Sequence, residues 1–88
     1  MKSETQFFKA VANERRATIL RLLKKKGSLS VGELASLLGL SFKSTSKHCV
    51  ILHHADLVVR RQVSLEMIYD VNTKHPFFRK SLASLLEL

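Results

Sequence analysis

Residues 30–55 read SVGELASLLGLSFKSTSKHCVILHHA and predict two helices joined by a tight turn. Ser30 is followed three residues later by Glu33, which is the capping-box pattern of a helix start. Apolar residues then recur at helical spacing until Gly39, where a turn needs a positive φ angle or a close approach of two backbones. Ser41 is suited to cap the second helix, Phe42–His54. The stretch therefore predicts a helix-turn-helix.

The second helix of this pair has two faces of different chemistry. Thr45, Leu52 and either His48 or Cys49 form the stripe that we expect to be buried. The start of the helix is small, polar and basic, which suits a helix that enters the major groove of DNA. Lysine and serine each have several possible partners on DNA, so these side chains do not predict a preferred base sequence. The predicted DNA-binding residues of this segment are Ser41, Lys43, Ser44, Ser46, Lys47 and His48.

A β-hairpin is predicted after residue 55, because the spacing of apolar residues changes from helical to alternating. Its strands are residues 57–61 (LVVRR) and 67–71 (MIYDV), joined by the link 62–66. The link has no Gly, Asn or Pro, so its turn type is not predictable. Arg60 and Arg61 lie on the first strand, where we expect them to contact the phosphate backbone.

Two helices are predicted before this segment. Residues 3–11 form the first, with Ser3 as its cap, and a helix capped by Asn13 ends in three lysines before Gly27. The lysine run is either a solvated helix end or a further phosphate contact. Phe7 and Phe8 are adjacent in the short first helix, so we expect at least one to face a partner chain.

A final helix is predicted from Pro76, which fits the first turn of a helix. It is too short to cross a membrane, since a span needs ~20 apolar residues. Its apolar residues therefore predict pairing with a second chain, with packing in the core of its own chain as the alternative. The predicted dimer interface is Phe7, Phe8, Phe78, Leu82, Leu85 and Leu86.

Composition agrees with a nucleic-acid partner. The 88 residues include 15 Lys and Arg against 7 Asp and Glu, a formal net charge of +8. A small basic domain suits a polyanion, although basic charge also serves solubility, and an anionic membrane surface is the other candidate. The chain has one cysteine and no signal-peptide pattern, so we expect a cytoplasmic protein without a disulfide.

The sequence contains few of the residue patterns that catalytic sites and metal sites require. There is no nucleophile motif, no paired acid set and no glycine loop for phosphate, so we expect no enzyme activity and no cofactor. Cys49 and His53 have i, i+4 spacing on one helix, but two ligands do not make a closed zinc site. A lone buried cysteine usually behaves as a small hydrophobic residue. We therefore predict no metal site.

Five segments resemble the ArsR-type winged-helix repressors in order and spacing. They are FKAVANERRATIL (8–20), VGELA (31–35), GLS (39–41), SKH (46–48) with Leu52, and ADLV (55–58). The resemblance covers about residues 5–71 and implies a homodimer, held by its first and last helices, that binds an imperfect palindrome near a promoter and usually represses it.

The sequence also departs from that family. The Cys-x-Cys pair of metal-sensing members is absent from Val31–Leu38, and the last helix lacks their paired His and acidic ligands. Asp56 occupies the position of a usual glycine, and the usual glycine of the wing is missing from Val63-Ser64-Leu65.

We therefore predict one domain over residues 1–88, mainly α with a β-hairpin. The expected architecture is a winged helix-turn-helix of about five helices and a two-stranded wing. The predicted function is transcriptional regulation, with double-stranded DNA and a second copy of the chain as partners and no membrane partner. The alternative is a winged-helix module that contacts protein or RNA and has no operator of its own.

Overall fold

Residues 2–75 are described by the computed structural model, and they form four helices and three strands. The helices are α1 (Lys2–Val11), α2 (Glu14–Lys26), α3 (Val31–Leu38) and α4 (Phe42–His54). The strands are β1 (Leu29–Ser30), β2 (Val58–Val63) and β3 (Glu66–Val71). The predicted order of helices followed by a hairpin is confirmed, and α1 begins one residue earlier than expected.

Polar side chains start three of the helices, as predicted. Asn13 accepts a hydrogen bond from the backbone N–H of Arg16 at the start of α2. Ser30 and Glu33 form the reciprocal capping box of α3, with distances of 2.9 and 3.0 Å. Ser41 accepts from the N–H of Ser44 at 3.0 Å and so caps α4. These bonds satisfy N–H groups that have no partner within their helices.

The sheet has three strands, which corrects the expected two-stranded wing. β1 pairs antiparallel with β3, and the strand order is β1-β3-β2. Leu29 and Ser30 were not predicted as a strand because two residues show no alternation; they become one by pairing with Tyr69 and Ile68. The hairpin link is also shorter than expected, since the strands extend to Val63 and Glu66 and leave a two-residue loop.

A single core lies between the helices and the inner face of the sheet. Its members come from every helix and from the sheet, so α2 and α4 are held in one position relative to the hairpin. The largest fully buried side chains are Tyr69, Ile19, Leu20, Leu23, Leu34, Leu52 and Leu57. No helix among the described residues is long and apolar enough to cross a membrane.

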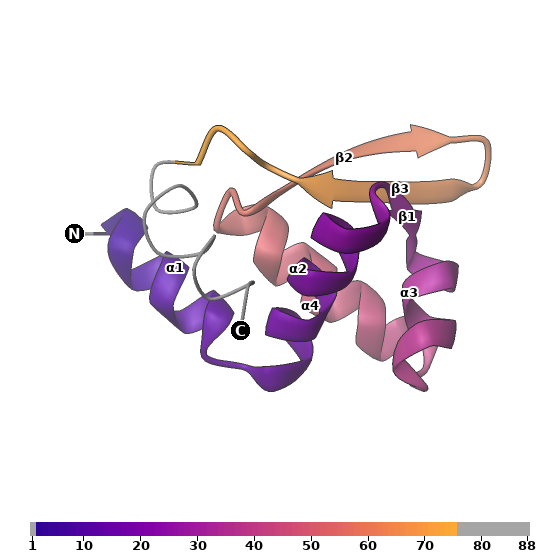
Figure 1. Cartoon of the computed structure of the whole chain (residues 1–88), viewed down its shortest axis with the longest axis horizontal. Coiled ribbons are helices and arrows are strands. Elements are labelled where there is room, and N and C mark those ends of the chain that lie inside the picture. The colour runs from indigo at the N-terminus through magenta and orange to yellow at the C-terminus, as the bar shows by residue number, and fades with distance from the viewer. Residues whose placement is uncertain (1, 76–88) are drawn as a thin grey trace.

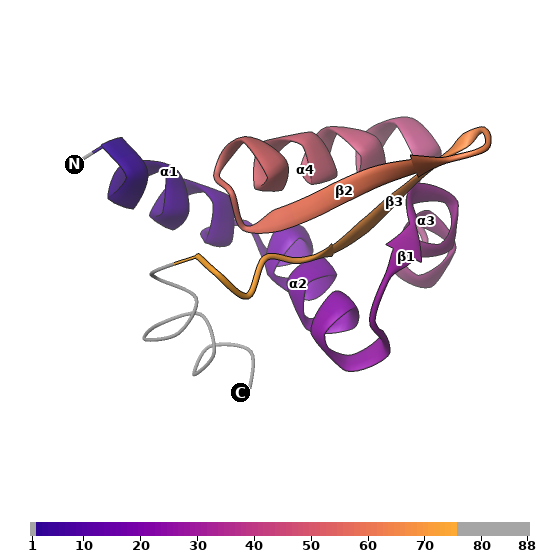
Figure 2. The same cartoon turned by 90° about the horizontal axis from the view of Figure 1, so that it is seen from above.

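The two ends of the molecule carry different elements. The loop between β2 and β3 and the first turns of α4 lie at one end, beside α3, and α1 lies at the other (Figure 1). The view from above shows the same separation along the long axis (Figure 2). The start of α4 and the hairpin loop are therefore well separated from α1.

The two phenylalanines of α1 have opposite environments. Phe7 is 2% exposed and its ring stacks on His75, with centroids 5.7 Å apart. Phe8 is 57% exposed. Phe7 is thus packed within its own chain, against His75, and a contact of Phe7 or Phe8 with a second chain stays a prediction. The predicted last helix and its Phe78, Leu82, Leu85 and Leu86 lie outside the described residues.

Candidate nucleic-acid interface

The turn between α3 and α4 depends on the conformation of Gly39. Its φ is 67° and its ψ is 32°, a left-handed conformation that costs glycine little. A side chain added there meets no atom within 4 Å, so the glycine serves the backbone angle and not a close approach. The N–H of Leu40 then donates to the carbonyl of Ala35 at 3.1 Å and closes the end of α3.

A buried stripe holds α4 against the core. Thr45, Cys49 and Leu52 are each 0% exposed, which settles the predicted choice between His48 and Cys49 in favour of Cys49. The buried hydroxyl of Thr45 is satisfied because it donates to the carbonyl of Ser41 at 2.9 Å. The rotation of α4 about its axis is fixed by these three side chains.

The opposite face of α4 is basic. Lys43 and Lys47 are exposed and lie four residues apart, so they occupy neighbouring positions on one face of the helix. Ser44 and Ser46 are half-buried on either side of them, and the capping residue Ser41 is exposed. Five of the six residues predicted from this segment therefore gather at the exposed start of α4.

The sixth predicted residue, His48, contacts its own chain. Its Nδ1 lies 3.4 Å from a terminal guanidinium nitrogen of Arg16. Arg16 also donates to the carbonyls of Ala10 at 2.8 Å and Lys9 at 3.1 Å. One guanidinium thus joins the end of α1 to α2 and α4. Arg16 was not singled out from the sequence, because its partners are brought together only by the fold.

Two histidines of α4, His48 and His53, are affected by burial and by nearby positive charge. Burial lowers the pKa of His48, and the charges of Arg16 and then Arg15 lower it further. Burial also lowers the pKa of His53; Arg60 and His54 add to this effect, and Asp56 opposes it. Both imidazoles are therefore neutral in the folded protein near neutral pH, and His48 Nδ1 can accept from Arg16.

Acidic pH is expected to destabilise the fold through these two groups. The unfolded chain protonates its histidines around their ordinary pKa of about 6.5, above the folded values, so stability falls as the pH is lowered through that region. We expect the urea midpoint to fall between about pH 7.5 and 5.5 and His48→Gln to reduce the fall. The exposed His54 supplies the matched control, His54→Gln. An equal effect of both variants contradicts a special role for His48.

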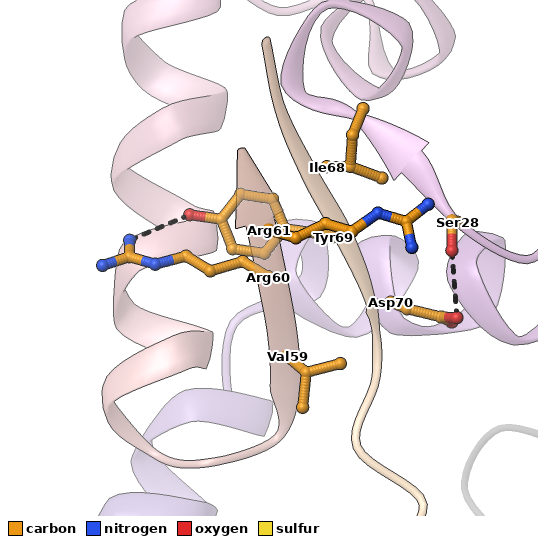
Figure 3. A pocket seen from close by; sticks show the side chains of 7 residues that line it. All are labelled: Ser28, Val59, Arg60, Arg61, Ile68, Tyr69 and Asp70. Atoms are coloured by element: carbon orange, nitrogen blue, oxygen red, sulfur yellow. Dashed lines mark hydrogen bonds between the residues drawn. The ribbon is translucent and has the colours of Figure 1, made fainter. Parts of the chain in front are cut away.

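Arg60 and Arg61 lie on opposite faces of the hairpin. Side chains alternate along a strand, and Arg60 pairs across the sheet with buried Tyr69 while Arg61 pairs with Ile68. Arg60 points to the side of α4 and donates to the Tyr69 hydroxyl at 3.4 Å, whereas Arg61 lies on the other side, towards Ser28 (Figure 3). The two residues therefore cannot contact DNA from the same face of the wing.

Two residues other than glycine adopt positive φ angles at the ends of the hairpin. Asp56 has a φ of 60°, as expected for a position that glycine usually occupies, and its carbonyl accepts from the side chain of Asn72 at 2.7 Å. Ser64 has a φ of 57° in the two-residue loop of the wing. Leu65, beside it, is 95% exposed. The loop at the tip of the wing, Ser64-Leu65, therefore carries one hydroxyl and one apolar side chain and no positive charge.

The chemistry of Cys49 does not favour a metal or thiol site. Burial raises the pKa of its thiol to about 12, so the nucleophilic and metal-binding thiolate is disfavoured. Within residues 2–75, no three His, Cys, Asp or Glu side chains gather where they could hold a metal ion. The absence of a metal requirement stays a prediction.

A glycine turn between two packed helices, followed by a hairpin beside the second helix, defines the winged helix-turn-helix class. Residues 13–59 match the model of the arsR family of bacterial regulatory proteins, more than half of this chain. The chain belongs to that family.

Solved structures agree with this assignment. Reduced HlyU from Vibrio cholerae is 32% identical, with a TM-score of 0.78 over 98% of this chain and 83% of that one. NolR from Sinorhizobium fredii is 31% identical, with a TM-score of 0.80 over 98% and 83%. A Mycobacterium bovis fragment, described as the homodimeric winged helix-turn-helix DNA-binding domain of a possible ArsR-family regulator, is 26% identical, with a TM-score of 0.79 over 98% and 73%. No curated protein matches the sequence significantly.

Proposed function

We propose that this chain is a cytoplasmic homodimer that binds an imperfect palindrome in double-stranded DNA and represses transcription nearby. The observation that carries the proposal is the exposed basic start of α4, where Lys43 and Lys47 share one face beside the glycine turn. The recognition helix of a helix-turn-helix uses this part of its length to contact base edges in the major groove. The M. bovis fragment, described as homodimeric and DNA-binding, supports the same assignment.

In this proposal, one end of the molecule contacts DNA and the other end pairs with a second copy of the chain. The start of α4 supplies base contacts through Ser41, Lys43, Ser44, Ser46 and Lys47. Arg60 contacts a DNA phosphate from the side of the wing that faces α4. Arg61 lies on the opposite side of the wing and can contact the DNA backbone only from there. His48 acts mainly through Arg16. The end that carries α1 pairs with a second copy, so two recognition helices meet two half-sites.

Regulation without a bound metal is part of the same proposal. The described part of α3 has no Cys, His or Asp, and the thiol of Cys49 is held neutral by burial. The affinity for DNA is therefore expected to be the same before and after treatment with a chelator.

The decisive experiment is a selection of bound sequences from random duplex DNA, followed by affinity measurements at several salt concentrations. A dimer that makes roughly 6–10 phosphate contacts loses about 10³–10⁵-fold in affinity between ~50 and ~200 mM salt. A selected site with two inverted halves about one helical turn apart supports the homodimer. Failure to bind any duplex at low salt contradicts the proposal and favours a module for protein or RNA.

Pairing through α1 predicts that Phe8→Asp produces monomers. Phe8 is exposed in the single chain, so a carboxylate at this position should be tolerated by the fold but is buried on pairing. Sedimentation equilibrium should show the mass of one chain. Leu65→Asp places the same charge at the other end of the molecule and should leave the dimer intact. An intact Phe8→Asp dimer places the interface elsewhere.

A further inference from the structure

The first residue of α4 is a large apolar side chain that the core does not use. Phe42 is 64% exposed, although it lies between the capping residue Ser41 and the basic Lys43. It is not part of the core cluster that holds the rest of the helix. An aromatic ring left in water does not gain the free energy of burial, so the exposure of Phe42 indicates that a binding partner covers it.

We propose that Phe42 contacts the C5-methyl group of a thymine in each half-site and so contributes to sequence selection. This inference rests on the proposed DNA-binding function. The ring has no donor or acceptor, and the thymine methyl is the apolar group that the major groove presents. Phe42 is therefore suited to recognise thymine and to leave hydrogen-bonding readout to its neighbours.

The surroundings of Phe42 favour DNA as its partner. Ser46 lies one turn further along the same face, and Lys43 and Lys47 place two cations beside it. Phosphate contacts from such cations set the register of the helix on the duplex, which holds the ring against one base pair. The exposed Leu37 and Ile51 lack this setting, because they lie in α3 and towards the far end of α4.

The test uses uracil, which pairs as thymine does and lacks only the methyl group. The full chain and its selected site are used, and each thymine of both half-sites is replaced in turn by uracil. Affinity is measured by fluorescence anisotropy at one salt concentration. One thymine position should lose about fourfold per half-site, the value of one buried methyl group, and about fifteenfold when both are replaced.

The variant Phe42→Ala should bind the selected site more weakly and should bind its thymine and uracil forms equally. Because the comparison is a double-mutant cycle, any effect of uracil on duplex shape cancels. Leu37→Ala removes a similarly exposed side chain from the neighbouring helix and should keep the full methyl effect.

Three results overturn the inference while leaving the proposed function in place. They are a selected site with no invariant thymine, equal binding of thymine and uracil by the wild type, and a methyl effect that persists in Phe42→Ala. If the wild-type chain binds no duplex, the proposed function itself fails.

Discussion

Replacing Lys43 and Lys47 together by alanine should remove most of the salt dependence that α4 contributes to DNA binding. A dimer loses four cations, so the slope of log affinity against log salt should become shallower by about 3–4. If the loss is purely electrostatic, the affinity falls by about 10³-fold at ~0.1 M salt. Both side chains are exposed, so the fold should be retained. Titrations of the selected duplex at several salt concentrations measure the slope directly.

Lys24 and Lys25 provide a control that changes net charge by the same amount. They are exposed in the last turn of α2, and this end of the helix lies away from α4 (Figure 2). Their double alanine variant should change the slope little, as the solvated-end interpretation of the lysine run requires. Equal slopes for the two double variants mean that overall charge, rather than the face of α4, attracts the DNA.

Leu52→Ala should cost about 2–5 kcal/mol of stability, since it leaves a cavity where α4 meets the core. Leu52 is 0% exposed and belongs to the stripe that fixes the rotation of α4. The next residue, Ile51, is 42% exposed, so Ile51→Ala should cost less than about 1 kcal/mol. The expected loss in Leu52→Ala is a large fraction of the ~5–15 kcal/mol free energy of unfolding of a typical domain.

Urea unfolding measures both variants, at one protomer concentration because the stability of a dimer depends on concentration. DNA binding by Leu52→Ala should weaken only as far as the folded fraction falls. Equal costs for Leu52→Ala and Ile51→Ala would contradict the assignment of the buried stripe.

Local sequence signals were sufficient for the helix-turn-helix. The capping box of Ser30 and Glu33 and the cap at Ser41 work within four residues of chain, so they act whatever surrounds them. The positive φ angles at Gly39 and Asp56 follow from turns that are equally local. The start of α4 could be predicted for the same reason, since helix period and cap together place its lysines.

Neighbouring residues on a strand point to opposite faces, so alternation places Arg60 and Arg61 on different sides of the hairpin, although both were expected to contact the phosphate backbone. Alternation does not predict which of the two arginines lies on the side of α4. This choice is decided by the burial of Tyr69 beneath Arg60, which depends on how the sheet packs on the helices. The short strand β1 has the same origin, since it exists only through its pairing with β3.

By itself, the sequence determined the four described helices, the caps of α2, α3 and α4, and the polar and basic start of α4, because these depend on contacts a few residues apart. Only the tertiary structure decided that Phe7 is buried while Phe8 is exposed, that Arg16 reaches His48 across 32 residues, and that Phe42 is left outside the core. The physical reason is that burial depends on how the elements pack together. Residue type and spacing indicate which side chains could be buried, and the packing of the elements decides which of them are buried.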